Sequence, residues 1–147
     1  MRTINAAGLA LIEQFEGKLL KAYQDVAGVW TIGYGHTRGV HSGMVMTQEQ
    51  AEQTLQDDLL TAKGAVESAV GAAATTDNQF AAMVSLCYNV GASAFRASIV
   101  LRDHRAGSYP AAGDAFLLYN NSKINGVLKP VAGLTRRRTA ERALYMS

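Results

Sequence analysis

Apolar positions recur at helical spacing near the start of the chain. Leu9, Ile12 and Glu16 follow one another at i, i+3 and i+7, so the glutamate continues an apolar stripe. Asn5 is a suitable N-cap and Gly17 is a suitable residue just beyond a helix end. The pattern therefore predicts a first helix between Asn5 and Gly17, with Glu16 at its C-terminal end.

Residues 22–46 change from helical to β periodicity. Glycines punctuate the segment, and VWTIGYGHT alternates between apolar and polar or small residues as strands do. If Gly28 supplies the positive φ of a three-residue hairpin loop, we expect Asp25 and Thr31 to be cross-strand partners on one sheet face. A two-residue turn would instead place these two side chains on opposite faces.

The rest of the chain has the periodicity and caps of helices. Two capping boxes, Thr47 with Gln50 and Thr76 with Gln79, predict a long helix to about Val70 and a second helix through DNQFAAMVSLCYNVG. Further helices are expected over about 93–105, from Ser108 and Pro110 to about Tyr119, and from a cap at Thr135 to the end; NNSKINGVLKPVAG between them is a polar, glycine-rich loop or a small hairpin.

These elements predict an α+β, mainly helical domain spanning residues 1–147. We expect a β-containing lobe over about 1–46, a connecting helix region over 47–75 and a helical lobe over 76–147. With 48% apolar and 18% charged residues, the chain has the composition of a folded domain. Its net charge of +2 is too small to indicate nucleic acid.

Charge is divided unevenly along the chain. Residues 1–75 carry a net charge of −3 and residues 76–147 a net charge of +5. The basic half either favours approach to an anionic surface or polymer, or is an ordinary solvated face.

The cysteine and histidine positions indicate no disulfide, metal or cofactor. Cys87 is the only cysteine, so no disulfide can form within the chain. It lies in an apolar helical run and is expected to be a core residue, rather than a thiol nucleophile near His36. The three histidines, His36, His41 and His104, have no metal-ligand spacing.

No segment approaches the roughly 18 apolar residues of a membrane span. Residues 6–12 are apolar but short, Glu13 follows them, and no signal-peptide cleavage pattern is present. We read this segment as the core face of a helix, and we expect synthesis in the cytoplasm without a stable membrane anchor.

Glu16, Asp25 and Thr31 are the candidate catalytic residues, with spacing E-x8-D-x5-T. The apolar stripe and the negative end of the helix dipole both disfavour an anion at Glu16, which suits a general acid. Asp25, in a wetter turn, suits an ionised partner that holds a water together with the Thr31 hydroxyl. The alternative is that all three are solvated surface residues.

Three segments resemble one known family. EGKLLKAYQDVAGVWTIGYGH, QFAAMVSLCYNVGASAF and GLTRRRTAERALY are similar to blocks of the phage-type lysozymes, glycoside hydrolase family 24, in the family's order. The resemblance implies a lysozyme-like fold with a cleft between the lobes. It also implies cleavage of the β-1,4 bond between N-acetylmuramic acid and N-acetylglucosamine. Glu16 would protonate the leaving oxygen, and Asp25 and Thr31 would activate a water for an inverting reaction.

The resemblance also suggests roles for three further residues. His36 would buttress the hairpin by hydrogen bonding, and Arg136 would lie close to Glu16 and tune its proton affinity. Asn89 would contact an acetamido group of the substrate, unless it is simply a helix-terminal asparagine. The run Arg136 to Arg138 lacks the aromatic or recognition-helix pattern of a nucleic-acid site.

The chain differs from well-known family members in having a shorter connecting region, no N-terminal membrane-tethering helix and no separate wall-binding module. The absence of a tether and module implies release through a holin-type membrane lesion. We expect a monomer that acts on bacterial peptidoglycan in the periplasm. A lytic transglycosylase and a wall-binding protein that no longer cuts are the alternatives. Asp25 and Thr31 argue against the first, and Glu16 argues against the second.

Overall fold

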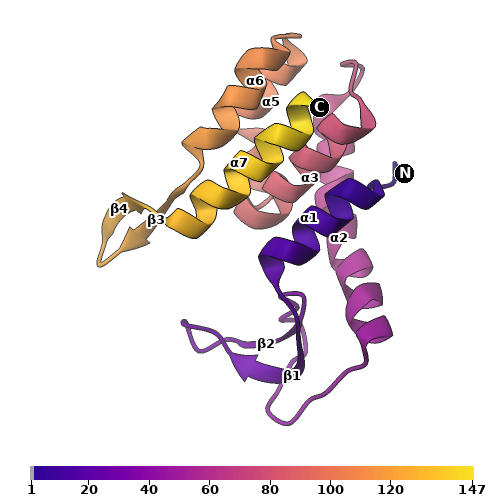
Figure 1. Ribbon diagram of the computed structural model, residues 1–147, viewed down its shortest axis with the longest axis vertical. Helices are drawn as coiled ribbons and strands as arrows, with labels where there is room; N and C mark the ends of the chain where they lie inside the picture. The colour runs from indigo at the N-terminus through magenta and orange to yellow at the C-terminus, as the bar shows by residue number, and fades with distance from the viewer. Residues whose placement is uncertain (1) are drawn as a thin grey trace. The chain divides into compact units, whose positions relative to one another are not determined.

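The computed structural model describes residues 2–147, which form helices and two short antiparallel hairpins (Figure 1). This confirms the predicted α+β, mainly helical class. The elements are α1 (Ala6–Glu16), β1 (Leu19–Gln24), β2 (Trp30–Gly33), α2 (Gln48–Val70), α3 (Asp77–Val90), α4 (Ala92–Arg96), α5 (Ile99–Arg105), α6 (Tyr109–Ala115), the 3-10 turn η1 (Phe116–Leu118), β3 (Asn121–Ile124), β4 (Val127–Pro130) and α7 (Ala132–Met146).

The chain divides into two compact units. One unit is continuous and runs from Ile12 to Leu60, and the other combines the chain up to Leu11 with the chain from Thr61 onward. The divisions fall within α1 and within α2. The lobe boundaries expected near residues 46 and 75 stay predictions.

The predicted caps of the early helices are confirmed. The Asn5 side chain accepts a hydrogen bond from the Gly8 amide at 2.9 Å, and α1 ends at Glu16. The Thr47 hydroxyl accepts from the Gln50 amide at 3.1 Å, while the Thr47 amide donates to the Gln50 side chain at 2.8 Å. These contacts are local in sequence, which is why the residue pattern predicts them.

Two later helices differ from the expectation. The helix predicted over 93–105 is interrupted, because the Ser98 hydroxyl accepts from the Leu101 amide at 3.2 Å and caps a new helix, α5. The last helix begins at Ala132 rather than after a cap at Thr135. Thr135 instead donates its hydroxyl hydrogen back to the Val131 carbonyl at 3.2 Å, as threonines inside helices do.

The glycine-rich stretch after η1 forms the small hairpin that was one of its two expected forms. β3 and β4 pair in register, with Ile124 opposite Val127 across an Asn125-Gly126 turn. Both turn residues have positive φ, +53° and +77°, which is the geometry of a type I′ turn. The Asn-Gly pair is the sequence signal for this hairpin.

The core of the larger unit is built around α3, whose residues from Phe80 to Cys87 are all buried. This helix is apolar on most sides, as a central helix must be. Cys87 is 2% exposed, and burial raises the pKa of its thiol to about 11. Its predicted place as a core residue is confirmed.

The three consecutive arginines of α7 are divided between the surface and the core. Arg136 is exposed, but Arg137 and Arg138 are buried with Glu141. Arg138 Nε lies 2.6 Å from Glu141 Oε1, and Arg137 Nε lies 3.3 Å from Oε2. Ser85 of α3 also donates its hydroxyl hydrogen to Oε2. Burial raises the pKa of Glu141, and the two arginines oppose that shift.

His104 of α5 connects its own helix to α7 and to the loop before α3, all in the same unit. It is fully buried, with Nε2 2.8 Å from the Thr75 hydroxyl and Nδ1 2.6 Å from the Tyr145 hydroxyl. Thr75 already donates its hydroxyl hydrogen to the Ala73 carbonyl at 2.9 Å, so Nε2 carries the ring hydrogen and Nδ1 accepts from Tyr145. The network is complete with a neutral imidazole, and burial lowers the pKa of His104.

We expect the free energy of unfolding to fall as pH falls from 7 towards 5. The folded-state pKa of His104 lies below its ordinary value of about 6.5, so the unfolded chain binds a proton more readily and the contribution is lost on acidification. The slope from one such group is at most about 1.4 kcal/mol per pH unit. Urea denaturation across this pH range measures it.

The matched variant is His104→Gln, in which this part of the slope disappears. The shift of Glu141 has the opposite sign and is present in both proteins, so it cancels in the comparison. Equal pH slopes in the parent and the variant would contradict the assignment.

Candidate active site

A tight loop after β2 forms the base of the candidate site. The amide of Ile32 donates to the His36 carbonyl, and the amide of His36 donates to the Ile32 carbonyl, both at 2.9 Å. Gly35 has a φ of +77°, which a residue with a side chain rarely adopts. The loop turns within a few residues while Ile32 and Tyr34 are buried in the core of the 12–60 unit.

Glu16 lies against this loop. It is the last residue of α1 and is half-buried, as the apolar stripe predicts. A β-carbon on Gly35 would lie 3.7 Å from Glu16 Oε1 and 3.9 Å from its Cδ. The glycine therefore leaves room directly beside the carboxyl group of the predicted acid.

Asp25 organises the turn between β1 and β2. Its Oδ1 accepts hydrogen bonds from the amides of Ala27 at 2.8 Å and Val29 at 2.9 Å. The Asp25 carbonyl also accepts from the Gly28 amide at 2.9 Å, and Gly28 has a φ of +80°. Asp25 is exposed, and Oδ2 has no hydrogen-bond donor among residues 2–147. The wet turn and the positive φ of Gly28 are confirmed.

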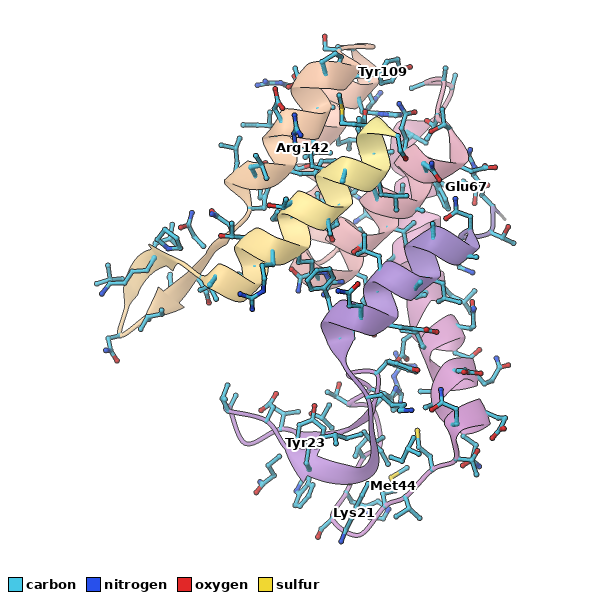
Figure 2. All side chains as sticks on the ribbon, in the orientation of Figure 1. Lys21, Tyr23, Met44, Glu67, Tyr109 and Arg142 are labelled. Carbon is cyan, nitrogen blue, oxygen red and sulfur yellow. The ribbon has the colours of Figure 1, made fainter. Side chains whose placement is uncertain are left out.

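The predicted pairing of Asp25 with Thr31 is wrong. Thr31 lies opposite Tyr23, which Figure 2 labels, and the Asp25 amide donates to the Val29 carbonyl at 3.0 Å. The three-residue loop is centred on Ala27 instead of Gly28. Because this displaces the pairing by two residues, side-chain alternation is preserved, and Asp25 and Thr31 are diagonal neighbours on one face.

The Thr31 hydroxyl is oriented by its own strand. Thr31 is 4% exposed, and Oγ1 donates to the Val29 carbonyl at 3.0 Å. Its hydrogen is therefore committed, and the oxygen keeps lone pairs that can accept a hydrogen bond.

His36 fastens the loop to α2. Its Nδ1 lies 2.8 Å from Asp58 Oδ2, and both side chains are partly buried. This is a hydrogen bond of the buttressing kind expected for His36. Sequence reasoning missed Asp58, and the one signal for it is its position on α2 between the buried Leu55 and Leu59.

Asn89 and Arg136 belong to the other unit. Asn89 is exposed in the last turn of α3, just before Gly91, whose amide donates to the Cys87 carbonyl at 2.8 Å. Arg136 is exposed near the start of α7. The roles expected of these two residues stay predictions.

Comparisons with known proteins find relatives that match nearly the whole chain. An endolysin of Acyrthosiphon pisum secondary endosymbiont phage 1 is 42% identical, with 98% of each chain covered. The endolysin from Escherichia coli O157:H7 phage FAHEc1 superposes with a TM-score of 0.94 at 38% identity, covering 99% of this chain and 94% of that one. The muramidase domain of SpmX from Asticaccaulis excentricus gives 0.92 at 38% identity, covering 100% and 99%.

The fold and these matches define a lysozyme-type glycoside hydrolase. A family model described as phage lysozyme matches residues 13–141, and the chain belongs to that family. It is therefore a peptidoglycan-degrading enzyme. None of the helices within residues 2–147 is long and apolar enough to cross a membrane.

We expect Gly35→Ala to lower activity more than Gly39→Ala. Both residues have positive φ, +77° and +69°, so each alanine costs about 1–2 kcal/mol of backbone strain. Only at position 35 does the new methyl group meet Glu16, because nothing lies within 4 Å of a β-carbon at position 39.

Clearing rates of purified walls, compared at equal folded fraction, measure the difference. Similar activities for the two variants would show that the space beside Glu16 does not matter.

Proposed function

We propose that this protein is a muramidase that hydrolyses the β-1,4 bond between N-acetylmuramic acid and N-acetylglucosamine with inversion. The observation that supports the proposal is the register of β1 and β2, from which strand alternation assigns Asp25 and Thr31 to one hairpin face, in the same compact unit as the half-buried Glu16. A face with a carboxylate and a hydroxyl suits the holding of one water.

The hydrogen-bond roles at this face fit a water nucleophile. Thr31 Oγ1 already donates its hydrogen to Val29, and Asp25 Oδ2 is an acceptor, so both groups accept from the same water. With its two hydrogens held in this way, the water presents a lone pair to the anomeric carbon.

The proposed reaction is a single displacement. Glu16 donates its proton to the glycosidic oxygen as the bond to the anomeric carbon breaks. The water forms the new bond from the opposite side and passes a proton to Asp25. No residue forms a covalent bond to the sugar, and no cofactor takes part.

The remaining residues have supporting parts in this proposal. His36 holds the loop beside Glu16 through Asp58, Arg136 tunes the acid, and Asn89 contacts an acetamido group. The protein acts as a monomer on the wall in the periplasm, after synthesis in the host cytoplasm and release through a holin-type lesion. Cleavage of the glycan strands would weaken the wall and permit host lysis.

We expect Glu16→Gln to fold normally and to clear walls at least 100-fold more slowly. An amide of the same shape cannot protonate the leaving oxygen, and general acid catalysis contributes about 10²–10⁴-fold. Mass spectrometry of digested murein provides the readout. Reducing-end products from the parent protein indicate hydrolysis, whereas 1,6-anhydro products would indicate a transglycosylase. A well-folded Glu16→Gln protein that still cuts murein would show that Glu16 is not the general acid.

We expect the first product to be the α-anomer. If Asp25 and Thr31 hold the water, attack occurs on the face away from Glu16 and inverts the β linkage. Proton NMR of fresh product, recorded before mutarotation, distinguishes the anomers. Thr31→Ala should slow the reaction without changing the anomer, because the water loses one holder. An initial β-anomer would mean that Asp25 and Thr31 are misassigned.

A further inference from the structure

The β3–β4 hairpin exposes both of its faces. Every residue of the two strands is exposed, and the aliphatic side chains of Ile124, Val127 and Leu128 are 44%, 55% and 64% exposed. Figure 1 shows the hairpin extending away from α6 and α7, two helices that belong to the same unit as the hairpin. A two-stranded hairpin without a packed face is only marginally stable in water, and exposed apolar surface of this kind often marks a binding site.

The register gives each face the same combination of groups. Lys123 pairs directly with Leu128 on one face, and Lys129 lies two residues from Val127 on the other. Each face therefore presents aliphatic carbon beside one ammonium group. The outer edges of β3 and β4 pair with no strand among residues 2–147, which leaves backbone N–H and C=O groups available to a ligand.

The exposed charges along the hairpin and its flanking residues have one sign. No aspartate or glutamate occurs between Asp114 and Glu141 in the sequence. Arg137 and Arg138 are buried and paired with Glu141. The exposed charges of this stretch are therefore Lys123, Lys129 and Arg136. The surface is complementary to a polyanion that also offers apolar surface and amides.

We propose that the β3–β4 hairpin binds peptidoglycan outside the catalytic residues. Its aliphatic side chains pack on the apolar faces of sugar rings, and its open strand edges bond with acetamido and stem-peptide amides. Lys123 and Lys129 pair with the free carboxylates of stem peptides. This inference rests on the proposed function, because it takes the same polymer as its ligand.

The open edges also distinguish peptidoglycan from an anionic membrane as the partner. A hairpin inserted into hydrocarbon would bury its unpaired backbone groups without hydrogen bonds, at a cost of several kcal/mol for each group. A hydrated glycopeptide supplies donors and acceptors along both edges.

The test measures sedimentation of the full chain with purified murein sacculi, in a Glu16→Gln background and at about 50 mM salt, where charge screening is weak. We expect Lys123→Glu/Lys129→Glu to weaken binding by on the order of tenfold, since two exposed ion pairs become repulsions. The matched control is Arg96→Glu/Arg105→Glu, which changes the net charge equally on α4 and α5 and should bind within about twofold of the parent.

Two further measurements make the test specific. Sacculi whose carboxylates are converted to neutral amides should bind the parent as weakly as they bind the lysine variant. Lys123→Gln/Lys129→Gln should show a smaller loss of the same sign on untreated sacculi, and this keeps the test valid if charge reversal disturbs the hairpin. Circular dichroism checks the fold of each variant.

Several outcomes would overturn the proposal. These are equal sedimentation of the lysine variants and the parent, an equal loss in the arginine control, a loss that persists on amidated sacculi, and stronger binding to phosphatidylglycerol vesicles than to sacculi. Soluble fragments are measured in the same tubes. Fragment release by the Glu16→Gln protein would count against the assignment of Glu16, and it is distinct from any change in sedimentation.

Discussion

The reciprocal hydrogen bonds between Ile32 and His36 are the constraint on which the candidate site depends. They close a loop in which position 35 has a φ of +77°, which glycine adopts without strain, and the missing side chain leaves space beside the Glu16 carboxyl. The same closure buries Ile32 in the core and directs His36 towards Asp58 on α2. The β1–β2 hairpin and α2 are thereby held by one short segment, which also lies beside the carboxyl group of Glu16.

Features determined by neighbouring residues could be predicted from the sequence. The caps at Asn5, Thr47 and Thr76, the end of α1 at Glu16 and the positive φ at Gly28 each depend on a few adjacent side chains. The wet turn at Asp25 and the burial of Cys87 follow from local composition in the same way. These features include the positions of the predicted acid and its carboxylate partner along the chain.

Three features could not be predicted, because the folded geometry and not the residue pattern decides them. The register of β1 and β2 moved by two residues because Asp25 uses its own carboxylate to close the loop around Ala27, and residue spacing alone does not fix that centre. Arg137 and Arg138 look like surface charge in the sequence, but both are buried in the core, where Glu141 of the same helix pairs with them and Ser85 of α3 joins the cluster. Asp58 could not be assigned a role from the sequence, because its role comes from its contact with His36, 22 positions away.

The two hairpins show how similar turn chemistry leads to different uses. Both reverse at a glycine with positive φ, but β1 is also paired on its other edge, where the Ala22 amide donates to the Met44 carbonyl at 2.8 Å and the Met46 amide donates to the Leu20 carbonyl at 2.9 Å. This second pairing and the buried side chains of β2 fix Thr31 and its neighbours in place, as the proposed reaction requires. β3 and β4 have no such support among the described residues, and their backbone edges and side chains remain available. A hairpin whose outer edge is also paired suits chemistry at a defined distance. A hairpin with two unpaired edges suits contact with a large and variable polymer. This difference in edge pairing is the physical basis for proposing catalysis for β1–β2 and binding for β3–β4.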